Sequence, residues 1–185
     1  MNVAVYSGSF NPLHIGHLAI IKYMIEVAGF DMVYLIVSPK NPLKDSISSD
    51  SGIARYNAAV EAVSRHFNES VKADDIELTM PEPHYTIRTL DALRAREPEN
   101  TFTFVMGADN LADIRRWRDY SRILADHGVA VYPRTGFDLE TIKQDLLDEN
   151  PAYNIQIINA PMIDISSTQI REALSRGEDV SHLLM

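Results

Sequence analysis

Short apolar runs alternate with longer stretches of helical periodicity along most of the chain. Residues 2–7 (NVAVYS) form a short β-rich run that a glycine ends. Residues 32–38 (MVYLIVS) are almost continuously apolar, as in a strand buried on both faces. Between them, over residues 15–28, apolar side chains such as Leu18 and Ile21 recur at helical spacing. The first part of the chain therefore predicts a strand, a helix and a second strand.

The alternation continues to the end of the sequence. We expect further helices over residues 53–67, 86–97, 108–128 (broken once), 138–148 and 165–177, and further strands over residues 75–78 (weak), 101–107, 129–133 and 153–159. Irregular loops are expected over residues 38–52 and 80–85. This order predicts an α/β fold in a single domain, residues 1–185, with a doubly wound, mainly parallel sheet, helices on both faces and a Rossmann-like arrangement. Its crossovers should be right-handed.

The composition is that of an ordinary globular chain, and it excludes several kinds of site. The chain has 185 residues, 45% hydrophobic and 23% charged, which is enough for one domain with a substantial core. Cysteine is absent, which excludes disulfides and thiolate sites. No apolar run is long enough to span a bilayer, and the first residues lack the basic region of a signal peptide. We therefore expect a soluble, cytoplasmic protein without a membrane partner, as a monomer or a homo-oligomer.

The net charge of −9 restricts the kind of phosphate ligand that the chain could bind. Affinity for nucleic acid comes largely from basic groups that neutralise phosphates, so an acidic chain is a poor general binder of polyanions. Any positive charge that binds phosphate must be local. This favours a small, highly charged ligand and argues against a nucleic-acid partner.

The loop after the first predicted strand contains two histidines that flank a glycine. In open parallel sheets, ligands bind beyond the carboxyl ends of the strands, and Gly8 lets the backbone approach a ligand closely there. His14 and His17 are three residues apart, which places them on one face of a helix start, beside free backbone N–H groups that favour phosphate. The alternative is that they cap or pack the helix.

Two other kinds of site are disfavoured at this loop. The glycine spacing matches neither a dinucleotide fingerprint nor a P-loop. No third histidine or acidic ligand lies at a spacing that supports zinc, so no protein-bound metal is expected.

Loops elsewhere supply two further candidates. Ser166 or Ser167 is the expected N-cap of the last helix, whose first-turn N–H groups form an anion site, and Arg171 follows one turn later. A plain N-cap with a surface arginine is the alternative. Lys40 and Lys44 lie on a proline-stiffened loop after a buried strand, and a solvated loop is the alternative there.

The fourth candidate follows the predicted strand that ends at Gly107. Gly107 and Asp109 begin a helix after this strand, a position suited to ribose hydroxyls. Trp117 is the only tryptophan, and core packing is the alternative to a role in binding. The neighbouring arginines are interpreted as a solvated helix face: Arg115, Arg116 and Arg118.

Taken together, these residues resemble the nucleotidylyltransferase superfamily and, more closely, its bacterial nicotinate-nucleotide adenylyltransferase family. That family opens with a Gly-x-Phe turn and an H-x-G-H tetrad, matched by GSFNPLHIGH, and closes with S-x-T-x-x-R, matched by SSTQIR. Between these lie a Pro-x-Lys segment, a Tyr-Thr pair and a Gly-Ala-Asp followed by tryptophan, matched by Pro42, Lys44, Tyr85, Thr86, Gly107, Asp109 and Trp117. The sequence departs from the family pattern at Leu43, His84 and Asn11, where histidine, serine and aspartate are common.

The resemblance implies transfer of an adenylyl group from ATP to nicotinate mononucleotide, giving nicotinate adenine dinucleotide and pyrophosphate in NAD biosynthesis. The attacking phosphate is already an anion, so the reaction needs alignment and charge neutralisation rather than a protein nucleophile. Mg²⁺ would arrive with ATP and have few protein ligands. The implied catalytic residues are His14, His17, Lys44 and Arg171; the ATP-binding residues are Gly8, Ser9, Phe10, His17, Gly107, Asp109, Ser166, Ser167, Thr168 and Arg171; the nicotinate-binding residues are Tyr85, Thr86, Asp109 and Trp117.

Other functions remain open from the sequence. A class I aminoacyl-tRNA synthetase shares the H-I-G-H tetrad, but this chain is short, acidic and without a K-M-S-K-S motif. Phosphopantetheine adenylyltransferase shares both end motifs, and an enzyme that prefers nicotinamide mononucleotide is a further alternative. A non-catalytic nucleotide-binding module comes from a different class, and it predicts loss of the histidines or of Arg171, all of which are present.

Overall fold

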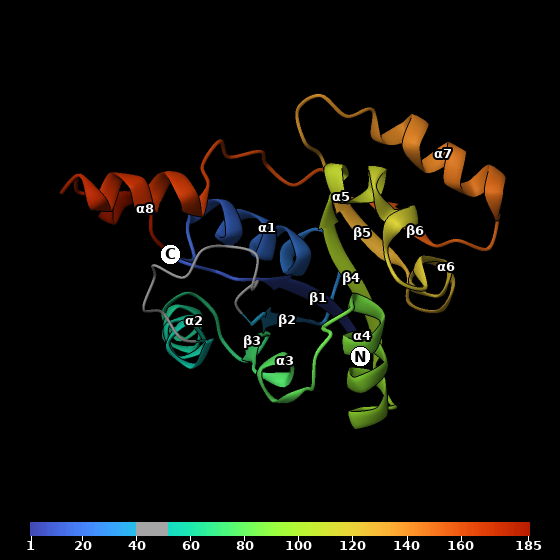
Figure 1. Ribbon diagram of the computed structural model, residues 1–185, viewed down its shortest axis with the longest axis horizontal. Helices are drawn as coiled ribbons and strands as arrows, with labels where there is room; N and C mark the ends of the chain where they lie inside the picture. The colour runs from blue at the N-terminus through green and yellow to red at the C-terminus, as the bar shows by residue number, and fades with distance from the viewer. Residues whose placement is uncertain (40–51) are drawn as a thin grey trace.

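A parallel sheet forms the centre of the protein. The computed structural model describes residues 1–39 and 52–185, and within them the sheet has six strands. These are β1 (Asn2–Gly8), β2 (Met32–Val37), β3 (Val71–Asp74), β4 (Thr101–Gly107), β5 (Val129–Tyr132) and β6 (Ile155–Ile157), in the order β3-β2-β1-β4-β5-β6 (Figure 1). Each neighbouring pair is parallel, which confirms the predicted fold class. The strand order reverses between β1 and β4, the switch point where open sheets bind ligands.

Helices cover both faces of this sheet. They are α1 (Ile15–Glu26), α2 (Gly52–His66), α3 (Ile76–Thr79), α4 (Thr86–Arg96), α5 (Ala108–Ala112), α6 (Tyr120–Arg122), α7 (Leu139–Glu149) and α8 (Ser167–Ser175), with 3₁₀ turns at Ile114–Arg116 and Ser181–Leu183 and a π-helical turn at Ile123–His127. Side chains of α1 and α2 pack in one apolar cluster, and those of α4, α5 and α7 pack in another. No helix in the described part of the chain is both long and apolar enough to cross a bilayer.

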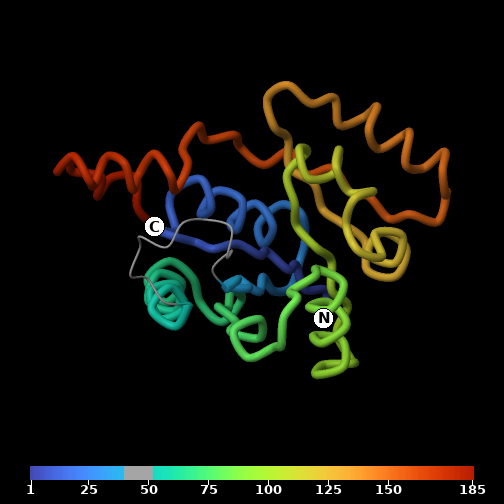
Figure 2. The backbone as a smooth tube through the Cα atoms, viewed as in Figure 1, coloured from blue at the N-terminus to red at the C-terminus, as the bar shows by residue number. Residues whose placement is uncertain are grey.

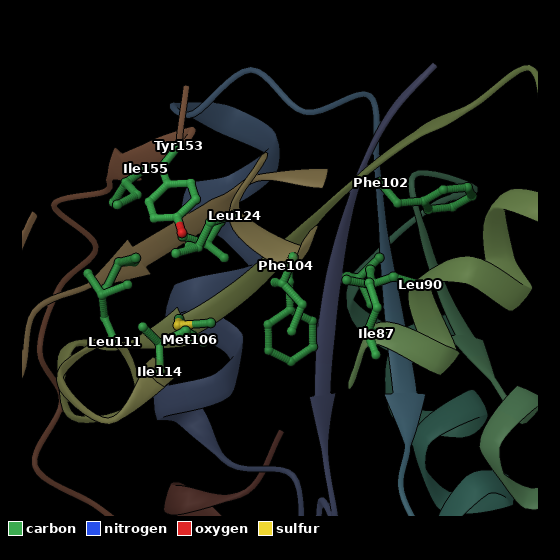
Figure 3. Close-up of a cluster of buried hydrophobic side chains, with 14 of the residues drawn as sticks. Ile87, Leu90, Phe102, Phe104, Met106, Leu111, Ile114, Leu124, Tyr153 and Ile155 are labelled. Atoms are coloured by element: carbon green, nitrogen blue, oxygen red, sulfur yellow. The ribbon is translucent and has the colours of Figure 1, made fainter. Parts of the chain in front are cut away.

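The two clusters lie on opposite faces because strand side chains alternate. Val5 of β1 belongs to the cluster of α4, and its neighbour Ala4 belongs to the cluster of α1. In Figure 3, Phe104 of β4 lies in the middle of the cluster that includes the side chains of α4, α5 and α7. The ring of Phe104 also meets Trp117 edge to face, with ring centroids 6.0 Å apart. Burial of the sheet on both faces explains the nearly continuous apolar runs of its strands.

The weak strand predicted at residues 75–78 is wrong. The strand lies earlier, at Val71–Asp74, and Ile76–Thr79 is a short helix. The buried carboxylate of Asp74 accepts the N–H of Ile76 at 3.0 Å, which turns the chain out of the strand. Glu77 is buried, whereas its apolar neighbours Ile76 and Leu78 are only half-buried. The hydroxyl of Thr89 donates to the carboxylate of Glu77 at 2.7 Å and so satisfies this buried polar group.

The helix predicted over residues 108–128 is interrupted more often than the single break expected. It is divided into α5, a 3₁₀ turn, α6 and the π-helical turn. Trp117 has an extended backbone, with φ −81° and ψ 144°, and Asp119 is left-handed at φ 50°. Neither conformation continues an α-helix, so the segment bends at these residues.

Candidate functional site

A cavity of about 950 Å³ opens where the loops after β1, β4, β5 and β6 meet. Its walls come from β1 and the start of α1, from Asp109 after β4, and from the segment after β5 that includes Arg134 and Phe137. Residues 160–167, which lead into α8, complete it. The cavity therefore lies at the carboxyl ends of the strands, where the sheet topology places ligands.

His14 and His17 lie in this cavity and cap the helix that they begin. Nδ1 of His14 accepts the N–H of Gly16 at 3.1 Å, and Nδ1 of His17 accepts the N–H of His14 at 3.1 Å. The two rings stack with centroids 3.7 Å apart. Because both Nδ1 atoms accept, each neutral imidazole has its proton on Nε2, where it can be donated to a ligand. Capping and ligand binding are therefore compatible roles here, not exclusive ones.

Both imidazoles are held in the neutral form. Burial, together with the positive charge of Arg134, lowers the pKa of His14 from 6.5 to about 4. Burial, then His14 and Arg134, lower the pKa of His17 to about 3. At neutral pH the site therefore presents two uncharged N–H donors rather than two cations.

Acidification should destabilise the protein through these two histidines. An imidazole with a lowered pKa binds fewer protons when folded, so its stabilising contribution is complete above 6.5 and is lost as the pH falls toward about 4 for His14 and about 3 for His17. The free energy of unfolding in urea should fall by about 1 kcal/mol per pH unit for each histidine in this window. The slope should be shallower in His17→Gln, and an identical slope would contradict the assignment of a neutral, buried His17.

Glycine and phenylalanine hold these rings in place. A Cβ on Gly16 would lie 2.9 Å from Cε1 of His14, so a side chain there would displace the imidazole from its capping position. Phe10, whose φ of 47° is left-handed, meets His17 edge to face with centroids 5.2 Å apart. A Cβ on Gly8 would lie 3.1 Å from the Phe10 ring. The small residues of this loop thus make room for the aromatic ones.

The start of α8 is joined to the loop after β1. Ser166 is the N-cap, and its hydroxyl accepts the N–H of Gln169 at 3.2 Å. The hydroxyl of Ser167 donates to the carbonyl of Pro12 at 2.9 Å, and Nη1 of Arg171 donates to the carbonyl of Asn11 at 2.6 Å. Figures 1 and 2 both show α8 beside the start of α1. The two end motifs of the sequence are therefore in direct contact.

Arg171 and Thr168 are already linked within α8. Nη2 of Arg171 donates to the hydroxyl of Thr168 at 3.2 Å. This leaves the guanidinium between the helix start and the loop after β1, both of which border the histidines.

Arg134 is a residue of the site that the sequence analysis missed. Its Nε lies 3.8 Å from Oδ1 of Asp109, and its guanidinium lies 5.3 Å from the centre of the Tyr132 ring. A Cβ on Gly107 would lie 2.6 Å from Oδ1 of Asp109 and 3.2 Å from Nε of Arg134, so a side chain there would displace this pair. The only signal for Arg134 was its position just after a predicted strand.

The residues expected to bind nicotinate, apart from Asp109, do not line the cavity. Tyr85, which is 39% exposed, precedes the first residue of α4, Thr86. The guanidinium of Arg118 lies 5.1 Å from the centre of the Tyr85 ring. Trp117 is half-buried against the core. The structure thus places these side chains near the junction of α4 with the segment after β4, outside the walls of the cavity.

Of the other residues predicted for the site, Ser9 is described by the structure, and the two lysines are not. Ser9 is exposed, and its carbonyl accepts a hydrogen bond from Arg55. Lys40 and Lys44, with the rest of the Pro-x-Lys segment, lie outside the described residues. Within residues 1–39 and 52–185, no group of three or more histidine, aspartate or glutamate side chains is placed to hold a metal.

Comparisons with known proteins identify the family of the chain. The cytidylyltransferase-like family model matches residues 5–173. The chain belongs to the cytidylyltransferase-like family. Two relatives in this family are each named "probable nicotinate-nucleotide adenylyltransferase". The protein of Flavobacterium johnsoniae is 36% identical, over 100% of this chain and 92% of the relative. That of Flavobacterium psychrophilum is 38% identical over the same shares.

A solved structure shares the fold of this family member. It is described as Plasmodium falciparum nicotinic acid mononucleotide adenylyltransferase complexed with NaAD, and it superposes with a TM-score of 0.77 over 97% of this chain and 86% of that chain. The identity is 21%, so the likeness supports the fold.

Proposed function

We propose that this protein transfers an adenylyl group from ATP to nicotinate mononucleotide, forming nicotinate adenine dinucleotide and pyrophosphate in NAD biosynthesis. Relatives named for this activity match the whole chain at 36% and 38% identity. The observation on which the proposal depends most is the contact between the two end motifs: Arg171 and Ser167 donate to carbonyls of the loop that leads to His14. Ser167 at the start of α8 lines the same cavity as His14 and His17, which supports this proposal.

The triphosphate of ATP is the ligand that these donors suit. The Nε2–H groups of His14 and His17 would bind the α-phosphate, with His17 nearest to it. The first-turn N–H groups of α8, with Arg171, would bind the β- and γ-phosphates. A neutral imidazole whose Nδ1 accepts a backbone N–H can donate a hydrogen bond from Nε2 to a phosphate oxygen.

The reaction itself requires alignment more than acid–base chemistry. A phosphate oxygen of nicotinate mononucleotide forms a bond to the α-phosphorus, and the bond from that phosphorus to the bridging oxygen of the β-phosphate breaks. The electron pair of the broken bond leaves with pyrophosphate. Mg²⁺ would enter as part of the ATP substrate and would shield the charge of the leaving group. The role of the protein is to hold the two anions in line and to stabilise this charge.

Other residues that line the cavity suit the nucleoside of ATP. Asp109 would bind ribose hydroxyls, as its place after β4 predicted. The apolar side chains of Phe137 and Met162, which are exposed at 43% and 63%, border the same cavity and can cover a purine base. In this structure Nε of Arg134 lies 3.8 Å from Oδ1 of Asp109. We expect Arg134 to add a further positive charge for the phosphates once Asp109 binds the sugar.

One assay decides between the possible acceptors. Pyrophosphate release from Mg²⁺-ATP should be measured with nicotinate mononucleotide, nicotinamide mononucleotide and phosphopantetheine in parallel. The largest kcat/KM is expected with nicotinate mononucleotide. A larger value with either of the others would reassign the acceptor. Binding of ATP without release for any acceptor would identify a non-catalytic nucleotide-binding protein.

Trp117→Ala tests the acceptor site separately from the ATP site. If the nicotinate ring stacks on Trp117, the apparent KM for nicotinate mononucleotide should rise about tenfold, which corresponds to the roughly 1–3 kcal/mol that stacking of a base on an aromatic ring contributes. The KM for ATP should change little, because Trp117 lies outside the cavity. Phe67→Ala is a matched aromatic control on the opposite face of the sheet. An unchanged KM for the acceptor would remove Trp117 from its binding site.

A further inference from the structure

A buried arginine lies behind the loop that contains the two histidines. Arg55 is in the first turn of α2, and 5% of its surface is exposed. The helix dipole disfavours a cation in the first turn, and burying a charge is costly unless hydrogen bonds compensate. The place of Arg55 therefore calls for specific partners, and backbone carbonyls at the carboxyl edge of the sheet are among them.

The guanidinium of Arg55 joins the ends of two neighbouring strands. Its Nη1 donates to the carbonyl of Ser9 at 2.8 Å and to the carbonyl of Ser38 at 2.7 Å. Ser9 directly follows β1 and Ser38 directly follows β2. The N–H of Ser38 also donates to the carbonyl of Gly8 at 2.9 Å. Nη1 of Arg55 thus links the start of the loop after β1 to the start of the segment after β2.

The carbonyl of Ser9 belongs to the peptide group that precedes Phe10. Phe10 is left-handed at φ 47°, a conformation that a non-glycine residue keeps only where surrounding contacts impose it. In this conformation the Phe10 ring lies edge to face with Tyr6, at 5.5 Å between centroids, and with His17, at 5.2 Å. Direct contacts therefore connect Arg55 to the imidazole of His17 through one peptide group and one ring.

We propose that Arg55 is a positioning residue for His17: by binding the carbonyl of Ser9, it holds Phe10 in the conformation that packs its ring against the imidazole. Arg55 contacts no substrate in this role. Its effect on turnover rests on the proposed adenylyl transfer, because a displaced imidazole no longer directs Nε2 at the α-phosphate. Its effect on the surroundings of His17 needs no substrate, because a Phe10 ring that moves away admits water to the imidazole.

The substrate-free test is an NMR titration of the imidazoles in Arg55→Ala. The pKa of His17, about 3 in the parent protein, should move toward 6.5 as water reaches the ring. Among the described residues, the other titratable or charged groups that face His17 are His14, Arg134 and Tyr6, and this substitution leaves all three in place. The matched control is Arg65→Ala, on the same helix, whose side chain is 57% exposed. The control should leave the pKa of His17 unchanged.

The kinetic test measures pyrophosphate release well below the melting temperature of each variant. Arg55→Ala should lower kcat about 10- to 100-fold, the range expected for an ångström-scale misplacement. The KM for nicotinate mononucleotide should stay within about twofold, because Arg55 positions a group that binds the α-phosphate of ATP and not the acceptor. Arg55→Lys keeps the charge and one nitrogen that can donate to both carbonyls, so its kcat and its His17 pKa should be intermediate.

The outcomes separate this inference from the proposed function. A His17 titration and a kcat in Arg55→Ala that match those of Arg65→Ala would overturn the positioning role. If Arg55→Ala does not fold, Arg55→Met decides, because it fills most of the same space without a donor for the carbonyls of Ser9 and Ser38. Parent values for both measurements in that variant would overturn the role. A parent protein that folds and releases no pyrophosphate would overturn the proposed function, and the titration alone would then decide the role of Arg55.

Discussion

Replacing His17 with alanine should lower kcat for pyrophosphate release by about 100- to 1,000-fold, the loss typical of removing one donor that stabilises charge in a transition state. Nε2 of His17 is available as a donor because its Nδ1 is occupied by the N–H of His14. Its lowered pKa keeps the ring neutral over the working range of pH. The KM for nicotinate mononucleotide should change much less, because the hydrogen bond from His17 stabilises the transition state more than the bound substrates.

The structure also sets the control for this variant. His17 completes a capping box at the start of α1, so its replacement should reduce stability by about 1 kcal/mol in addition to its effect on kcat. Rates must therefore be compared well below the melting temperature. His66→Ala, at an exposed position on α2, should retain parent kcat. Near-parent turnover of His17→Ala would refute the role of His17 in the reaction.

Replacing Arg171 with alanine should lower kcat/KM for ATP by about 100-fold, because a charge-assisted hydrogen bond to phosphate is worth about 1.5–3 kcal/mol and the link to the loop after β1 disappears with it. Its Nη1 donates to the carbonyl of Asn11, and its Nη2 donates to Thr168. Arg171→Lys keeps the charge but cannot make both hydrogen bonds, so it should recover only part of the activity.

Arg176→Ala is the matched control for Arg171. It lies just after α8, its side chain is 59% exposed, and it pairs with Glu178 at 2.7 Å. Its removal should leave kcat/KM for ATP within about twofold of the parent, since exposed ion pairs contribute little. An Arg171→Ala variant as active as this control would assign Arg171 to the surface and would separate the terminal motif from ATP.

The order of strands and helices was predictable because burial on both faces of a parallel sheet leaves a distinct pattern of apolar runs. The pattern failed at residues 75–78, where Ile76 and Leu78 alternate with a glutamate as they would in a half-buried strand. The buried residue there is Glu77, and its partner Thr89 is twelve residues away in the sequence. Local periodicity cannot detect a polar residue that a distant hydrogen bond satisfies.

The site was predictable where its residues form local motifs. The two histidines and the start of the last helix could be chosen as candidates because their spacing is typical of phosphate-binding positions, and their roles in the reaction remain predictions. Arg134 and Arg55 could not, because an arginine in a loop or a helix looks the same in sequence whether it is solvated or buried. Their significance comes from Asp109 in one case and from the carbonyls of Ser9 and Ser38 in the other. These interactions exist only after the sheet has formed.

The hydrogen bonds that join α8 to the loop after β1 also have a consequence for when the site can exist. One of these hydrogen bonds joins Pro12 to Ser167, which is 155 positions later in the chain. The other joins Asn11 to Arg171, which is 160 positions later. Contacts between such distant residues form late, since a long loop must close first. A chain that has not yet docked its last helix therefore has the histidines but not the rest of the proposed triphosphate site. ATP should bind only the state in which α8 is docked. Bound ATP should therefore stabilise the docked position of α8 and slow the hydrogen exchange of its backbone amides.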